Sequence, residues 1–260
     1  DVFRIGSFLG LVGQVLGGDS LADIGPLKQL IARHVDDRLL ANVAAAHRQG
    51  RRLYVGTADL DAQMFIVWNM GLIATSGHPD ALELFRKTML ASASIPIAFP
   101  PVLFEVEVGG QRYDELHVDG AVAATVFLNG GVFRPRVLLE RAGRGPGREA
   151  IYIIHNGQLR AAPSPTPRSI VGIAGRVFEA AGRASVVGDL FRIYAFAARN
   201  GASYNWITIG PDVSLAAAEV FDKQKMGELY RIGYEAALAG PRWRTRPPGT
   251  DGMLQYDDEL

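Results

Sequence analysis

Cysteine is absent from this sequence of 260 residues, and this absence excludes several classes of site. Disulfides, thiolate nucleophiles and cysteine-ligated zinc all require a thiol. No run approaches the roughly 18 apolar residues of a membrane-spanning helix. The formal net charge is zero, because 27 Lys and Arg balance 27 Asp and Glu. A chain without excess positive charge has no long-range field that gathers polyanions, so nucleic acid is not expected as a partner.

The composition that remains is that of an ordinary globular protein, with 48% hydrophobic and 21% charged residues. Its length is sufficient for one large domain with a sizeable core. Segments with strand character alternate with segments of helical periodicity, which favours the α/β class. We therefore expect one three-layer α/β/α domain with a mixed sheet over residues 1–249, followed by a polar tail at 250–260.

Apolar spacing and the positions of glycine and proline predict the individual elements. In the first half we expect buried helix at 2–16, one helix over 20–49, strands at 52–57 and 64–68, and a helix at 79–90. A turn capped by Asp59 and Asp61 is expected between the two strands. In the second half we expect a turn at 129–131, strands at 151–154 and 205–209, and helices over 168–200 and 219–239.

A hairpin is predicted in the middle of the chain. Residues 102–108 alternate in their second half, Gly109-Gly110 suits a tight turn, and residues 111–118 are expected to pair back. Asp119 then lies at the end of the returning strand, followed by Gly120. An isolated Asp-Gly ordinarily marks a turn. A carboxylate in this position becomes a useful base only when partial burial raises its pKa.

Two sequence motifs, one before the hairpin and one at its end, point to a function for Asp119. Residues 91–101 (ASASIPIAFPP) and residues 117–121 (HVDGA) resemble two motifs of the patatin-like phospholipases. Blocks within 50–74 and 221–243 resemble a bacterial branch of the same family, so the resemblance covers most of residues 20–249. It implies that Asp119 is the proton acceptor of a Ser–Asp dyad and that Gly120 and Ala121 complete its motif.

The resemblance also implies the chemistry and its setting. It implies hydrolysis of acyl esters, with lipid or phospholipid as substrate, a membrane surface as a candidate partner, and neither a cofactor nor a metal. The bacterial branch favours an envelope-associated or periplasmic location over a cytoplasmic one.

The nucleophile of this family lies in a Gly-x-Ser-x-Gly motif, which the sequence does not contain. We therefore expect the nucleophile on a segment that precedes Asp1, a fold that is incomplete on its N-terminal side, and a chain that is inactive alone. The alternative of a different class is a non-catalytic lipid-binding or interaction domain. A Gly-x-Ser-x-Gly motif upstream of Asp1 would favour the enzyme.

A second esterase pattern competes with this interpretation. Residues 18–21 (GDSL) and 114–117 (DELH) match the two motif blocks of the GDSL esterases, with Ser20, Asp114 and His117 as the catalytic set. However, the glycine-rich segment before Ser20 is a poor strand, and in those enzymes the second block opens the final helix. A helix cap at Asp19 or Ser20 and a packed His117 are the favoured interpretations.

Overall fold

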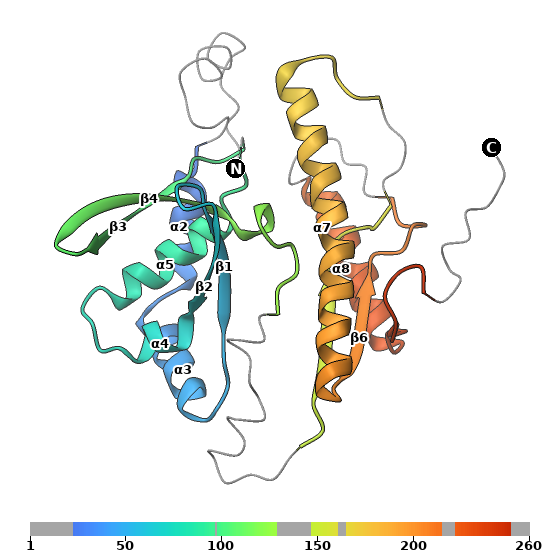
Figure 1. Ribbon diagram of the computed structural model, residues 1–260, viewed down its shortest axis with the longest axis horizontal. Coiled ribbons are helices and arrows are strands. Elements are labelled where there is room, and N and C mark those ends of the chain that lie inside the picture. The colour runs from blue at the N-terminus through green and yellow to red at the C-terminus, as the bar shows by residue number, and fades with distance from the viewer. Residues whose placement is uncertain (1–22, 97, 129–146, 161–164, 215–221, 251–260) are drawn as a thin grey trace. The chain divides into compact units, whose positions relative to one another are not determined.

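The computed structural model describes residues 23–96, 98–128, 147–160, 165–214 and 222–250 (Figure 1). The chain divides into two compact units, Asp1–Ala124 and Thr125–Leu260, and each is described by itself. The helix expected at 2–16, the turn expected at 129–131, Ser20 and nearly all of the tail lie outside the described residues. The assignment of residues 1–249 to one domain stays a prediction.

Unit 1 combines an antiparallel sheet with short helices. Its helices are α2 (Gly25–His34), α3 (Asp37–Arg48), α4 (Met70–Thr75) and α5 (Ala81–Ser92). Its strands are β1 (Tyr54–Asp59), β2 (Met64–Asn69), β3 (Val102–Val108) and β4 (Gln111–Asp119), followed by the 3₁₀ turn η1 (Gly120–Val122). The strand order is β2-β1-β4-β3, so β4 has a neighbour on each side.

The single helix expected over residues 20–49 is wrong, because the described part of this segment forms two helices. Val35 leaves the helical conformation with ψ 90° and is buried. Asp36 then caps α3, because its Oδ1 accepts a hydrogen bond of 2.8 Å from Leu39 N–H. A capping carboxylate satisfies one of the free N–H groups of a first turn, so it starts a new helix there.

Helix α4 was not expected. It follows β2 without a loop, and Asn69 caps it by accepting a hydrogen bond of 3.0 Å from Leu72 N–H. Met70 is fully buried and forms a core with Val35 and Phe85. The short helix therefore ties the end of β2 to the helical layer, and α5 lies against β1 and β4 (Figure 1).

Unit 2 contains a parallel pair of strands, β5 (Ala150–His155) and β6 (Ser203–Thr208), and the helices α7 (Ile170–Asn200) and α8 (Lys223–Leu238). The helices expected over 168–200 are one continuous helix, capped by the Ser169 side chain. Because parallel strands require a crossover connection, α7 packs across the pair. The core joins Ile153, Leu190 and Trp206. The α/β class is confirmed, with antiparallel and parallel pairing in two separate sheets.

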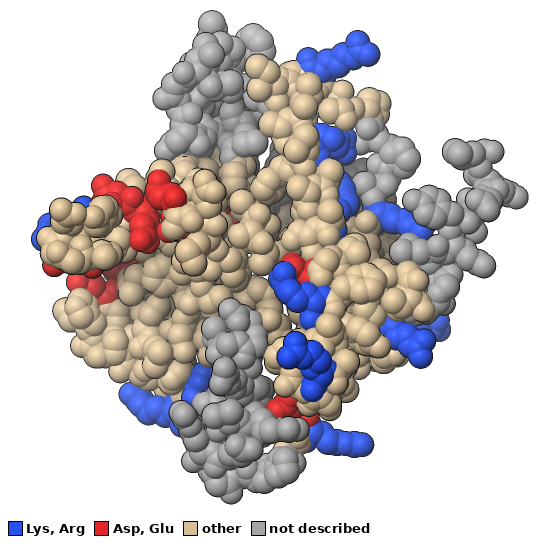
Figure 2. Space-filling view, viewed as in Figure 1, with Lys and Arg blue, Asp and Glu red and all other residues tan. Residues whose placement is uncertain are grey.

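Acidic side chains gather over the β3–β4 hairpin, at the left of Figure 2. Glu105 and Asp114 are directly opposite each other in the register, and both are exposed. Like charges in this arrangement repel each other and also repel anionic lipid head groups. The hairpin is therefore a poor contact for an anionic membrane. Among the described helices, none has the length and apolar character required to cross a bilayer.

Candidate active site

Asp119 is the last residue of β4, as the sequence predicts. The hairpin turn before the strand is also as expected, with Gly109 and Gly110 at φ 61° and 81°. The backbone of Asp119 is held from two sides. It is paired with Thr57 of β1 in the register, and its N–H donates a hydrogen bond of 2.9 Å to the Ser94 carbonyl just after α5. The main chain therefore fixes the position from which the carboxylate extends.

The Asp119 carboxylate is partly buried and accepts a hydrogen bond of 2.9 Å from Ala121 N–H on Oδ1. Burial raises the pKa of the Asp119 carboxyl above its ordinary value, because it disfavours the charged form. The hydrogen bond from Ala121 stabilises the charged form and opposes this shift. The result is a carboxylate that is a stronger base than one in water and whose orientation is fixed.

Gly120 is required by a close approach of two backbones. A Cβ atom at this position would lie 2.7 Å from the Gly56 carbonyl oxygen and 3.0 Å from Cε2 of Phe65. Gly120 is not among the glycines with positive φ, so the reason for a glycine here is space and not a left-handed backbone conformation. Its missing side chain lets η1 lie against β1 and so sets the direction of the chain beyond Asp119.

His117 is a packed residue, as expected, and is 1% exposed. Its ring lies among aromatic side chains, 4.6 Å from the Phe104 ring and 5.7 Å from the Trp68 ring between centroids. Its Nδ1 is 2.9 Å from Thr57 Oγ1, which also accepts a hydrogen bond of 2.8 Å from Trp68 Nε1. If the Thr57 hydroxyl donates to Nδ1, the proton of His117 resides on Nε2, which lies 3.3 Å from Glu115 Oε2.

Replacing Thr57 with Val is expected to destabilise the protein by about 2 kcal/mol, since a methyl group leaves Trp68 Nε1 and His117 Nδ1 without their partner. Urea unfolding followed by fluorescence measures this change. Thr57→Ser keeps the hydroxyl and should cost less. Equal losses in the two variants would show that packing, and not the hydrogen bonds, is what matters here.

Asp59, Glu115 and His117 are the described side chains that could hold a metal ion, with one ligand atom each, all within 4.8 Å of one another. Hydrogen bonds already engage them. Asp59 Oδ1 accepts from the N–H groups of Asp61 and Ala62, which confirms the expected capped turn. A cation would have to replace the hydrogen bond between Glu115 and His117. That no metal is required stays a prediction.

The GDSL arrangement is not supported by the described residues. Asp114 and His117 are three positions apart on one strand, so their side chains point to opposite faces of the sheet. Asp114 is exposed, whereas the ring nitrogens of His117 contact Thr57 and Glu115. The pairing of Asp114 with His117 that this alternative requires is therefore wrong. Ser20 lies outside the described residues.

Asp119 affects stability in a pH-dependent way. Burial raises the pKa of Asp119 in the folded state above its ordinary value of 3.8. At pH values just above 3.8 the folded chain therefore still binds a proton that the unfolded chain has released. The resulting stabilisation is present at low pH and is lost as pH rises through the two pKa values. We expect Asp119→Asn to be more stable than the wild type at pH 7 and to lose this advantage below pH 3.8. Thermal melts across pH measure this, and a variant less stable at pH 7 would contradict it.

Comparison with protein-family models matches residues 3–130 to the family described as patatin-like phospholipase. No curated protein matches the chain. The matched segment includes nearly all of unit 1, together with Asp119, Gly120 and Ala121. It confirms the resemblance found in the sequence and supports a lipid acyl hydrolase family in general. The match at residues 3–130 is thus consistent with a patatin-like phospholipase family for this part of the chain.

Proposed function

We propose that the protein hydrolyses lipid acyl esters through a Ser–Asp dyad in which Asp119 is the general base. The observation that carries this proposal is the Asp119 carboxylate itself. It lies at a strand end inside the family segment, is oriented by Ala121 N–H, and has a pKa raised by burial. These are the properties that a carboxylate needs to accept a proton from a hydroxyl.

The reaction has two balanced steps. The serine oxygen attacks the ester carbonyl while its proton moves to the Asp119 carboxylate. The tetrahedral intermediate then expels the alcohol, which takes the proton from Asp119 and leaves an acyl-serine. Water attacks this ester, its proton passes to Asp119, and collapse of the second intermediate returns the proton to the serine oxygen and releases a carboxylic acid. No cofactor enters this scheme.

The serine is proposed to lie on a segment outside residues 1–260. The sequence contains no Gly-x-Ser-x-Gly motif. In addition, within the described residues the Asp119 carboxylate accepts its hydrogen bond from a backbone amide and not from a hydroxyl. The proposed substrates are lipid acyl esters as a class.

Residues 1–260 alone are expected to show no measurable hydrolysis of p-nitrophenyl butyrate and no labelling by a fluorophosphonate probe. A longer protein that joins them to a Gly-x-Ser-x-Gly segment encoded upstream should show both, with the label on that serine. Mass spectrometry of the labelled peptide identifies the residue. Activity of residues 1–260 that disappears in Ser20→Ala would contradict the proposal. Lipid binding without labelling of the longer protein would instead support a non-catalytic lipid-binding domain.

A further inference from the structure

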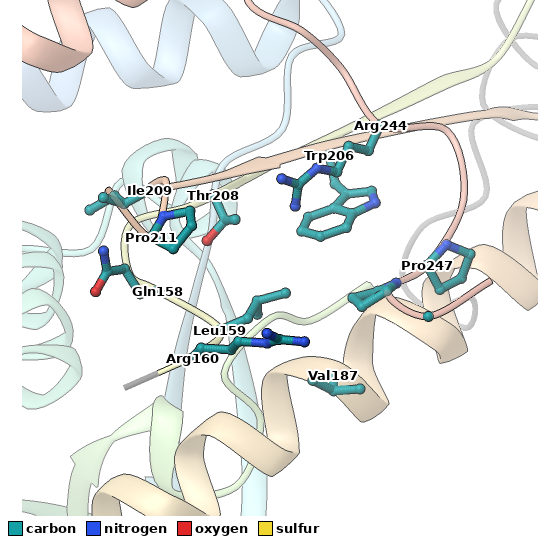
Figure 3. Close-up of a pocket in the computed structure, with 12 residues that line it drawn as sticks. Gln158, Leu159, Arg160, Val187, Trp206, Thr208, Ile209, Pro211, Arg244 and Pro247 are labelled. Atoms are coloured by element: carbon teal, nitrogen blue, oxygen red, sulfur yellow. The ribbon is translucent and has the colours of Figure 1, made fainter. Parts of the chain in front are cut away.

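Unit 2 contains a pocket of about 330 Å³ that plays no part in the proposed chemistry (Figure 3). Its lining residues come from 158–160, α7, 206–211 and 244–249, all outside the matched segment 3–130. Pockets for small molecules have volumes of roughly 300–1,000 Å³. This pocket is at the lower end of that range, which suits a ligand with a single short chain better than a whole two-chain lipid.

The walls of the pocket are mainly apolar. Trp206, Leu159, Val187 and Pro247 contribute to them. The indole of Trp206 is held in place because its Nε1 donates a hydrogen bond of 2.7 Å to the Arg246 carbonyl. A fixed aromatic surface beside aliphatic side chains favours an apolar ligand.

The neutral polar side chains at the pocket are already used to hold its walls. The Gln158 amide nitrogen donates to the carbonyls of Gly210 and Val213, at 2.6 and 2.8 Å. The Thr208 hydroxyl donates to the Gly157 carbonyl at 2.6 Å. These groups therefore have no free donor hydrogen for a ligand.

Two arginines complete the lining. Arg160 and Arg244 approach the pocket from opposite sides in the view of Figure 3. Within the described residues neither forms an ion pair, and both are exposed. The Arg244 guanidinium lies over the Trp206 ring, 4.8 Å from its centroid. This cation–π contact holds the guanidinium against the apolar wall of the pocket. The pocket thus combines an apolar interior with two guanidinium groups for which the described part of the chain provides no ion-pair partner.

We infer that this pocket binds an anionic amphiphile with one short apolar chain, such as a medium-chain fatty acid. The chain would lie against Trp206 and Leu159, and the carboxylate would contact Arg160 and Arg244. Guanidinium groups match the planar geometry of a carboxylate. This inference does not depend on the proposed hydrolase, although a carboxylic acid of this class is what acyl ester hydrolysis releases.

Isothermal titration of the full chain with octanoate, octanol and inorganic phosphate tests the inference. Octanoate should bind more tightly than octanol, which lacks the charge, and than phosphate, which lacks the chain. Arg244→Gln and Arg160→Gln should each weaken octanoate binding about three- to tenfold, since each removes one charged contact at an exposed rim.

Arg242→Gln is the matched control. It removes the same charge two residues from Arg244 at an exposed position that does not line the pocket, so octanoate affinity should not change. Circular dichroism confirms that each variant is folded. The inference is overturned if octanol or phosphate binds as tightly as octanoate, if octanoate does not bind at millimolar concentration, or if the three Arg variants behave alike. None of these measurements involves turnover, so their failure leaves the proposed hydrolase untouched.

Discussion

Replacing Asp119 with Asn is expected to lower kcat/KM for ester hydrolysis about 10²- to 10⁴-fold in a longer protein that carries the proposed nucleophile. This is the usual contribution of a positioned general base. The amide keeps the shape of the side chain and an oxygen that accepts from Ala121 N–H, but it cannot take a proton from the serine. Initial rates with a p-nitrophenyl ester over a range of concentrations give kcat/KM for both proteins.

Asp114→Asn is the matched control, because it is the same change on the same strand at an exposed position. Its kcat/KM should stay within a factor of about two of the wild type, as expected for a group that acts only through weak long-range electrostatics. The wild-type profile should also lose activity on the acid side at a pH above the ordinary aspartate pKa, since burial raises the pKa of Asp119. Full activity in Asp119→Asn would disprove the dyad.

Replacing Gly120 with Ala is expected to destabilise unit 1 by about 3 kcal/mol, at the upper end of the usual cost of overpacking. The added methyl would lie 2.7 Å from the Gly56 carbonyl oxygen and 2.8 Å from its carbon. These are backbone atoms of β1, which cannot move away as the end of a flexible side chain would. Urea unfolding measures the loss.

The control for this change is Gly188→Ala in α7. A Cβ atom there meets nothing within 4 Å, and alanine is the better helix former by about 1 kcal/mol. This variant should therefore be slightly more stable than the wild type. If Gly120→Ala were equally harmless, η1 and β1 would not be in the close contact that positions the chain after Asp119.

Local patterns predicted the elements that depend on neighbours in the sequence. The Gly109-Gly110 turn and the alternation before it were sufficient to place the β3–β4 hairpin and Asp119 at its end. The break at Val35–Asp36 was missed because apolar spacing continues across it, although Asp36 is a recognisable cap. Helix α4 was missed because six residues are too few to show helical periodicity.

The environment of Asp119 could not be predicted in the same way. The Ser94 carbonyl and the Thr57 register position are 25 and 62 residues away in the sequence, and only the folded chain brings them to Asp119. The clash that requires Gly120 depends on Gly56 in another strand. The pocket of unit 2 is similar, since its lining residues Arg160 and Arg244 come from segments far apart in the sequence.

The partly buried carboxylate of Asp119 has a consequence for how related sequences change over generations. A charged group that makes the folded chain less stable at neutral pH is retained only while selection for its chemistry outweighs selection for stability. In lineages that have given up catalysis, this position should drift to asparagine or an apolar residue, whereas Gly120 should persist because η1 still lies against β1. The residue at position 119 would then indicate whether a relative has kept the reaction, and the residue at position 120 whether it has kept the fold.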